Sequence, residues 1–407
     1  MKVEEVRDIL ARIRKVKVAV YGDFCLDAYW KLDPRESELS VETGRKASAI
    51  GSHSYSLGGA GNVVANIAAL EPASITAIGV IGADPFGFTI VRLLEALRVN
   101  TSGMVVQPDD FATMAYCKQI DDHDETARLD FGVFNRRTKS SDKALLTSLR
   151  EAFKTANVIV LNQQVVGSIT NESFIDEVNN LISEFPKKIV ILDSRHYGDK
   201  FKGVCRKMNQ RELSLLNADD PVSDEMMSMH DLKRFAARFH RQSGCPVFVT
   251  RGERGIYSFD ADGEHETPGV HVAGAVDPVG AGDTVLSALA CCLGSGIETW
   301  SAADFAGLAA VVTVQKLRQT GTAGGAEIMA MARDADYIYQ PELAADPGLA
   351  SYVRTSEIEL CYGAGSLPRG RISHAVFDND GTLSVLRHGW EAVMERVMVR
   401  VILGERY

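Results

Sequence analysis

Short apolar runs rich in β-branched residues alternate with amphipathic segments along the first two thirds of the chain. The amphipathic segments, such as Asn62–Leu70, Thr89–Leu97 and Ser141–Thr155, repeat their apolar residues with the period of an α-helix. This α/β alternation predicts a mainly parallel sheet sandwiched by helices, with ligands beyond the carboxyl ends of the strands. The runs expected to be strands are Val18–Tyr21, Ile75–Ile81, Val158–Asn162, Ile189–Asp193, Leu213–Asn217 and Val247–Thr250.

Two regions interrupt this alternation, at about 28–57 and 104–136, where polar strands such as Met114–Ile120 are expected. They predict a small β lid over the site, with an ordinary surface insertion as the alternative. The pattern fades again after residue 325. We therefore expect a main domain over 1–325, a linker over 326–371 and a second, incomplete α/β unit over 372–407.

Composition limits the possible binding partners of the protein and its cellular location. Lys and Arg number 44 against 54 Asp and Glu, and the resulting net charge of −10 would repel a nucleic-acid backbone. The opening residues lack the apolar core of a leader peptide, and the apolar runs are too short to cross a bilayer, so we expect no membrane partner and a cytoplasmic location. The seven cysteines form no C-x-x-C pair, which argues against a zinc site or a disulfide framework.

The strongest chemical signal is the segment Asp277–Thr284, which reads DPVGAGDT and precedes a long apolar helical segment. Gly280, Ala281 and Gly282 would bring backbone N–H groups together at the positive end of that helix, which forms an anion site. Asp283, in the first helical turn, could accept the proton of a hydroxyl that attacks a phosphoryl group there. The alternative interpretation is a Gly-rich turn with an Asp helix cap.

Two further patterns limit the class of phosphate site. The chain contains no G-x-x-x-x-G-K-[ST] sequence, which excludes a P-loop kinase. The G-x-G-x-x-G spacing of a dinucleotide fold does not follow the first strand.

These motifs resemble those of the ribokinase-like (pfkB) carbohydrate kinases. The D-x-x-G-A-G-D hallmark matches at Asp277–Asp283, and the Gly58–Gly59 stretch is followed by a helix and by the family's G-x-x-G-x-D-x-x-G pattern at Gly79–Gly87. The resemblance covers about residues 15–325. It implies a ribokinase-like fold and ATP-dependent phosphoryl transfer to a sugar hydroxyl, with Asp283 as the base.

The resemblance also assigns roles to other positions. On the substrate side it implies Asp27, Asp23, Gly58, Gly59, Asn62 and Arg128, with a capping carboxylate as the alternative for Asp23. On the nucleotide side it implies Thr250, Gly252, Gly255 and Asp277, although a simple β-turn is an alternative for 250–255. The family's N-x-x-E motif is placed at Asn217–Asp220, where Asn217 and Asp220 would organise Mg²⁺ through water, with an Asp in the place of the usual Glu.

Within the family, the chain most resembles bacterial heptose 7-phosphate kinases. The matching residues include Leu26–Trp30, the stretch 58–68 and Arg128–Phe131. The substrate implied is D-glycero-D-manno-heptose 7-phosphate, phosphorylated at position 1, and Arg128, Arg195 and His196 are candidate ligands of its existing phosphate. Another sugar or a nucleoside remains an alternative substrate.

The segment His374–Thr382 runs from a short apolar strand into D-x-D-G-T, which resembles the first motif of the haloacid dehalogenase-like phosphatases. In that family Asp378 would be the nucleophile and Asp380 the acid/base. The 25 residues after Thr382 are too few for the rest of that fold. We therefore interpret 372–407 as an incomplete unit without phosphatase activity.

The sequence leaves three hypotheses for the chain. It is an active kinase that uses Mg²⁺ with ATP, a silent nucleotide- or sugar-binding relative, or chiefly an assembly module. The lid segments also predict a homodimer, and the sequence leaves the need for a monovalent cation open.

Overall fold

The computed structural model describes residues 1–33, 35, 39–45, 47–121, 124–165, 172–217, 227, 229–270, 272, 275–317, 320–333, 335, 351, 352, 359, 360, 376 and 401. The chain divides into two units, Met1–Cys361 and Tyr362–Tyr407. The first unit contains the whole of the predicted main domain.

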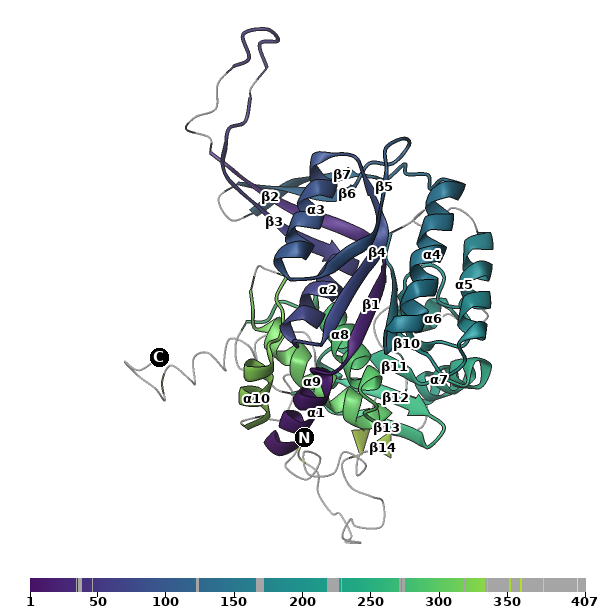
Figure 1. Cartoon of the computed structure of the whole chain (residues 1–407). Coiled ribbons are helices and arrows are strands. Elements are labelled where there is room, and N and C mark those ends of the chain that lie inside the picture. Colours follow the sequence, from purple (N-terminus) through teal and green to yellow (C-terminus); the bar gives the residue numbers. More distant parts are fainter. Residues whose placement is uncertain are drawn as a thin grey trace. The chain divides into compact units, whose positions relative to one another are not determined.

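Five of the six predicted apolar runs lie in strands of a nine-stranded sheet (Figure 1). Strands β5, β4, β1, β8, β9, β10 and β11 are parallel, whereas β12 and β13 add an antiparallel edge. In spatial order the strands are β13 (Gly263–Thr267), β12 (Ile256–Asp260), β11 (Val247–Thr250), β10 (Cys205–Asn209), β9 (Ile189–Ser194), β8 (Val158–Gln163), β1 (Lys17–Gly22), β4 (Ser74–Gly82) and β5 (Asn100–Gln107).

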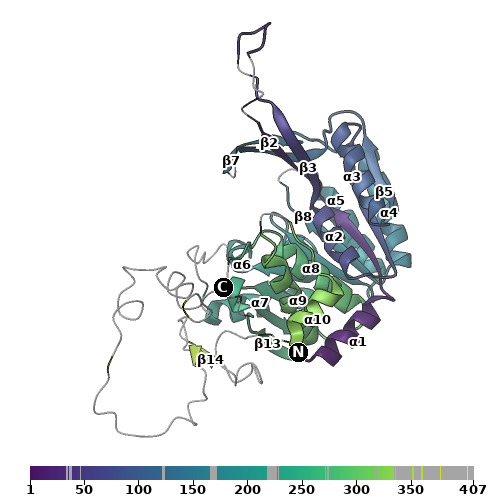
Figure 2. The same ribbon diagram turned by 90° about the vertical axis from the view of Figure 1, so that its left-hand side faces the viewer.

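Helices cover both faces of this sheet. Successive strand residues point to opposite sides, so each strand contributes side chains to the core on either face. Val20, Val160 and Ile191 belong to the core shared with α1 (Val3–Ile13), α2 (Ala60–Ala69), α3 (Pro85–Ala96), α8 (Ala281–Gly294), α9 (Thr299–Val314) and α10 (Gly325–Arg333). Ala19 and Ile159 pack with α4 (Lys139–Thr155) and α5 (Glu172–Glu184). A third core lies under α7 (Met229–Ser243), next to α6 (Gln210–Leu215) (Figure 2).

The two interrupted regions form a separate four-stranded sheet, in the order β3 (Ile50–Gly59), β2 (Phe24–Leu32), β6 (Met114–Asp121) and β7 (Asp124–Phe131). β2 follows β1 after a single residue, and β3 leads directly into α2, so this lid stands at the carboxyl ends of the main strands (Figure 1). The lid differs from the expected limits because β5 takes residues 104–107 into the main sheet. Pairing of two subunits through the lid stays a prediction.

The expected strand at Leu213–Asn217 is wrong. Its place in the sheet is taken by β10, and Leu213 lies on α6, which starts at a capping box formed by Asn209 and Glu212. β10 is hard to see in the sequence because Arg206 and Lys207 are buried within it. Both cations have oxygen partners in the structure, which makes their burial tolerable.

Toward the carboxyl end, α10 occupies the first residues of the segment expected to be a linker. Its Ile328 is fully buried in the main core, so the folded unit extends at least to Arg333. Two short strands, β14 (Ser351–Tyr352) and β15 (Glu359–Leu360), pair farther along. Asp378 and Asp380 lie outside the described residues, as does Asp220.

No helix in the part of the chain that the structure describes is both long and apolar enough to cross a bilayer.

The carboxyl end of α8 is held by the amino-terminal helix. Arg12 on α1 donates from Nη2 to the carbonyl oxygens of Ser295 and Gly296, at 2.9 and 2.8 Å. A cation at this end of a helix satisfies carbonyl groups that have no partner within the helix and complements its dipole. Arg12 therefore fixes the end of α8 opposite to Asp283.

We expect Arg12→Met to lower the free energy of unfolding by about 1–3 kcal/mol, because it leaves these carbonyl groups without their partner. Arg14→Met is the matched control, since Arg14 forms an exposed ion pair with Glu71 and should cost about 0–1 kcal/mol. Urea unfolding followed by circular dichroism measures both. Equal losses in the two variants would contradict the role given to Arg12.

Candidate active site

The start of α8 is a backbone anion site. Gly280 is the helix N-cap and has a φ of 83°, which favours glycine. The Ala281 N–H donates to the Pro278 carbonyl oxygen at 3.2 Å, whereas the N–H groups of Gly282 and Asp283 have no carbonyl partner earlier in the helix. Both lie at the positive end of the helix dipole. The motif thus has the backbone geometry of an anion site at a helix start, and its binding of a phosphoryl group stays a prediction.

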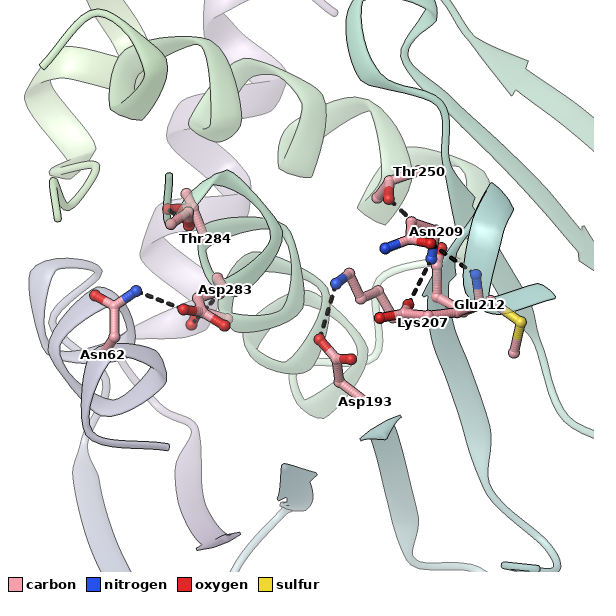
Figure 3. Close-up of polar contacts among 11 residues, drawn as sticks. Asn62, Asp193, Lys207, Asn209, Glu212, Thr250, Asp283 and Thr284 are labelled. Carbon is pink, nitrogen blue, oxygen red and sulfur yellow. Dashed lines mark hydrogen bonds and ion pairs between the residues drawn. The ribbon is translucent and has the colours of Figure 1, made fainter. Parts of the chain in front are cut away.

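Asp283 and Asn62 meet at this site from opposite ends of the sequence. Asn62 Nδ2, on α2, donates a hydrogen bond of 2.6 Å to Asp283 Oδ2 (Figure 3). Both residues were predicted from the sequence, and the structure brings them together. A hydroxyl group of a substrate placed beside this carboxylate would also lie beside the anion site of α8.

A buried hydrogen-bond chain orients the Asn62 amide. Asn66 Nδ2 donates to Asn62 Oδ1 at 3.2 Å, which leaves the Asn62 amide nitrogen facing Asp283. The Asn66 oxygen in turn accepts from Thr284 Oγ1 at 2.7 Å, and Thr284 lies 2.9 Å from the hydroxyl oxygen of Thr313 on α9. Asn66 and Thr284 were not predicted, although they stand four and one residues after predicted site residues.

The surroundings of Asp283 shift its acidity. The pKa of Asp283 is raised to about 6, chiefly by burial and in smaller part by the charge of Asp193, which together outweigh the lowering by the hydrogen bond from Asn62 and the charges of Lys207 and Arg195. A carboxyl group with this pKa is mostly ionised at neutral pH and is a stronger base than an ordinary aspartate. It suits the role of a proton acceptor.

On the lid, Asp27 lies against the glycines of β3. A Cβ atom on Gly58 would stand 2.7 Å from Asp27 Oδ2, so the glycine leaves room for the carboxylate. Gly59 has a φ of 55°, and a Cβ atom there would stand 2.4 Å from the Asp23 carbonyl oxygen. Gly58 is thus packed against Asp27 and Gly59 against Asp23, and the binding of substrate by these residues stays a prediction.

Two cations on the lid share the Asp27 face. In the strand register Asp27 stands opposite Tyr116, and the next residues on that face are Tyr29, opposite Lys118, and Lys118, opposite Arg128. Burial raises the pKa of Asp27, and the charges of Lys118 and Arg128 lower it, which places both cations near that carboxylate. Arg128 was predicted; Lys118 was missed.

Asp23 binds backbone N–H groups, as expected of a capping carboxylate, and its contact with a substrate stays a prediction. Its Oδ2 accepts hydrogen bonds from the backbone N–H groups of Gln164 and Val165, at 2.7 and 2.9 Å. This carboxylate fixes the chain after β8, whereas Asp27 faces the lid side of the site.

The N-x-x-E pattern occupies another position. Asn217 is buried, and its amide donates to the Leu213 carbonyl and accepts from Arg238, so it joins α6 to α7. Asn209 and Glu212 instead carry the N-x-x-E spacing at the carboxyl end of β10, beside the start of the next helix. Each side chain bonds the other's backbone N–H at 2.8 Å. The pattern itself could have found them, had β10 been recognised.

The predicted nucleotide loop follows β11. Thr250 ends that strand, opposite Asn209 in the register, and Figure 3 shows the two near each other. Gly252 and Gly255 have φ values of 62° and 86°, and no atom lies within 4 Å of a Cβ built on Gly252, so backbone is accessible there. Asp277 accepts from the Val279 N–H at 3.1 Å and shapes the turn before α8.

The sequence did not predict an ion pair that lies at the ends of two neighbouring strands of the main sheet, β9 and β10. Lys207 Nζ on β10 stands 2.8 Å from Asp193 Oδ2 at the end of β9, and both side chains are buried. Burial alone would lower the pKa of Lys207, but Asp193 raises it above the ordinary value, so the ammonium is charged. The predicted phosphate ligands Arg195 and His196 follow Asp193 and are exposed.

Fold and site together define a phosphotransferase of the ribokinase-like class. The model of the pfkB family of carbohydrate kinases matches residues 15–323, and the chain therefore belongs to that family.

Curated relatives and solved structures agree with this assignment. The chain is 27% identical to the bifunctional protein HldE of Desulfatibacillum aliphaticivorans over 80% of its length and 65% of the relative's. It is 28% identical to the HldE protein of Aliarcobacter butzleri, over 76% and 63%. The chain thus spans less than two thirds of these relatives.

Among solved structures, the ribokinase of Arabidopsis thaliana complexed with ribose and ATP has a TM-score of 0.58 at 19% identity, covering 79% of this chain and 99% of that one. The ribokinase of Thermotoga maritima has a TM-score of 0.57 at 18% identity, over 78% and 100%. These likenesses confirm the predicted fold.

Because Asp283 must be ionised to accept a proton, we expect kcat/KM to fall about tenfold per pH unit below a pKa of about 6 and to level off above it. Asn62→Ala removes a hydrogen bond to the carboxylate, which raises the pKa of Asp283, so the acidic limb should move toward neutral pH. Asn180→Ala, on the exposed face of α5, is the control. A limb that stays in place in Asn62→Ala would argue against Asp283 as the titrating base.

Proposed function

We propose that this carbohydrate kinase transfers the γ-phosphoryl group of ATP to a hydroxyl of a sugar phosphate, with D-glycero-D-manno-heptose 7-phosphate, phosphorylated at position 1, as the best candidate. The observation that carries the proposal is the Asn62–Asp283 pair at the amino end of α8. The similarity to HldE proteins supports the choice of sugar.

The residues of the site account for each part of the transfer. Asp283 takes the proton of the substrate hydroxyl as its oxygen forms a bond to the γ-phosphorus. The bond from that phosphorus to the bridging oxygen breaks, and ADP leaves with the electron pair. The N–H groups at the start of α8 hold the charge on the transferring group. Asn62 keeps the carboxylate facing the acceptor.

A substrate that already carries a phosphate needs positive charge away from the transfer site. Lys118 and Arg128 supply it on the lid, on the same face as Asp27. Arg128 is held by a bidentate ion pair with Asp130, and the ammonium of Lys118 lies 4.9 Å from the centre of the Tyr29 ring. Of the two, Lys118 has the freer charge, and we assign it the larger part in binding the phosphate.

Magnesium fits the nucleotide side of the site. Glu212, Asn209 and Asp193 offer oxygen atoms, which Mg²⁺ prefers, but among the described residues no three acidic, His or Cys side chains are close enough to enclose a metal ion. We propose that Glu212 and Asn209 hold the ion through water. The ion would neutralise charge on the ATP phosphates.

The silent-binder hypothesis loses the observation that favoured it. That observation was an Asp in place of Glu in the N-x-x-E motif, at Asp220. The motif with its Glu is present at Asn209–Glu212, on the strand end that faces the site.

ADP release with Mg-ATP across a panel of sugars and sugar phosphates tests the proposal. We expect turnover with heptose 7-phosphate, a much weaker response to the unphosphorylated heptose, and a loss of about 10²–10⁴-fold in Asp283→Asn. Lys118→Met should raise KM for the sugar phosphate and leave the response to unphosphorylated sugars unchanged. The control is Lys143→Met on the exposed face of α4. Preference for an unphosphorylated sugar would overturn the choice of substrate.

Glu212→Gln tests the magnesium site. Removing the carboxylate charge should raise the Mg²⁺ concentration needed for half-maximal rate by about 10–100-fold, because outer ligands contribute to metal affinity on that scale. Glu177→Gln, on the exposed face of α5, should leave the Mg²⁺ dependence as it is. An unchanged Mg²⁺ requirement in Glu212→Gln would place the ion elsewhere.

A further inference from the structure

The side chains of Asp193 and Lys207 point to the face of the main sheet that α8 covers. Ile191 on β9 pairs with Cys205 on β10, and both belong to the core shared with α8. Two residues further along each strand, Asp193 and Lys207 face the same side. They stand at the carboxyl ends of their strands, where the apolar core gives way to the site, and join in the 2.8 Å ion pair.

The ammonium of Lys207 reaches the anion site itself. A Cβ atom built on Gly282 would lie 3.0 Å from Lys207 Nζ. In Figure 3, Asn62 lies on one side of Asp283 and Lys207 on the other. The helix start therefore meets a hydrogen-bond donor from α2 and a full positive charge from β10.

Burial of this pair is poorly explained by stability. Removing two charges from water costs several kcal/mol per ion, and apolar residues of similar size often serve a fold as well or better. Asn162, which pairs with Asp193 in the register, is also buried, and neither polar atom of its amide has a hydrogen-bond partner among the residues described. Such a row of polar groups suits a site that receives polar atoms of a ligand.

We propose that Lys207 is a catalytic residue that binds the γ-phosphoryl group during its transfer, with Asp193 as the residue that positions it. The inference rests on the proposed phosphoryl transfer and adds to the backbone groups a side chain that carries charge. Lys207 forms no covalent bond and loses no proton in the step. Its ammonium donates hydrogen bonds to a γ-oxygen, where negative charge is held as the bond to the bridging oxygen breaks.

Nucleotide binding separates this role from a structural one. The experiment compares the affinities of the full chain for AMP-PNP and ADP, each with Mg²⁺, by calorimetry in wild type and in Lys207→Met. We expect Lys207→Met to weaken AMP-PNP about tenfold, as for a lost charged hydrogen bond, and to leave ADP nearly unchanged. The rate of transfer should fall about 10²–10³-fold and recover in part in Lys207→Arg.

Two further variants complete the design. Lys202→Met removes an exposed lysine five residues away and should match wild type. Lys207→Met combined with Asp193→Asn leaves no unpaired buried charge, so it provides the same comparison if the single variant does not fold.

Equal affinities of wild type and variant for AMP-PNP, or equal weakening of both nucleotides, would overturn the inference and reduce Lys207 to a counter-ion for Asp193. A wild-type chain that binds both nucleotides but transfers no phosphoryl group to any sugar would overturn the proposed function. In that case the difference between AMP-PNP and ADP would still decide whether Lys207 contacts the third phosphate.

Discussion

The hydrogen bond between Asn62 and Asp283 is the contact on which the site depends. It joins α2, which continues the lid, to α8, which carries the anion site, across 221 residues of sequence. The helix that carries Asp283 starts at Gly280, whose φ of 83° favours glycine. The contact also needs Asn66 and Thr284, which fix the orientation of the Asn62 amide from beneath.

Several charged side chains lie around this contact. Carboxylates of Asp283, Asp193 and Glu212 gather at the strand ends, and burial raises the pKa of Glu212 as well as that of Asp283. Lys207 stands among them and offsets part of their negative charge through its ion pair with Asp193. On the lid, Lys118 and Arg128 lie on the same face as Asp27, and Arg128 is paired with Asp130.

Much of the fold was predictable because most strands are apolar runs bounded by turns, and the D-x-x-G-A-G-D segment fixed the start of α8. The failure at Leu213–Asn217 has a physical cause: β10 buries Arg206 and Lys207, which only their three-dimensional partners make acceptable, while the apolar face of α6 has the composition of a strand. Because β10 was missed, the sequence analysis assigned the N-x-x-E motif to Asn217–Asp220, eight residues after Asn209–Glu212. The partners of Asp23 could not be predicted for a related reason, because nothing local reveals that the backbone after β8 returns to it.

The join between β3 and α2 has a mechanical consequence. β3 ends at Gly59, and the helix that carries Asn62 begins at Ala60, with no intervening loop to absorb movement. If the lid rotates toward a bound sugar, α2 has to move with it, because the two are joined directly at Gly59, where the backbone has a φ of 55°. Binding of a sugar and the alignment of Asp283 by Asn62 would then change together. The base would be aligned when a sugar is bound, and a water molecule alone would be a poor acceptor of the phosphoryl group.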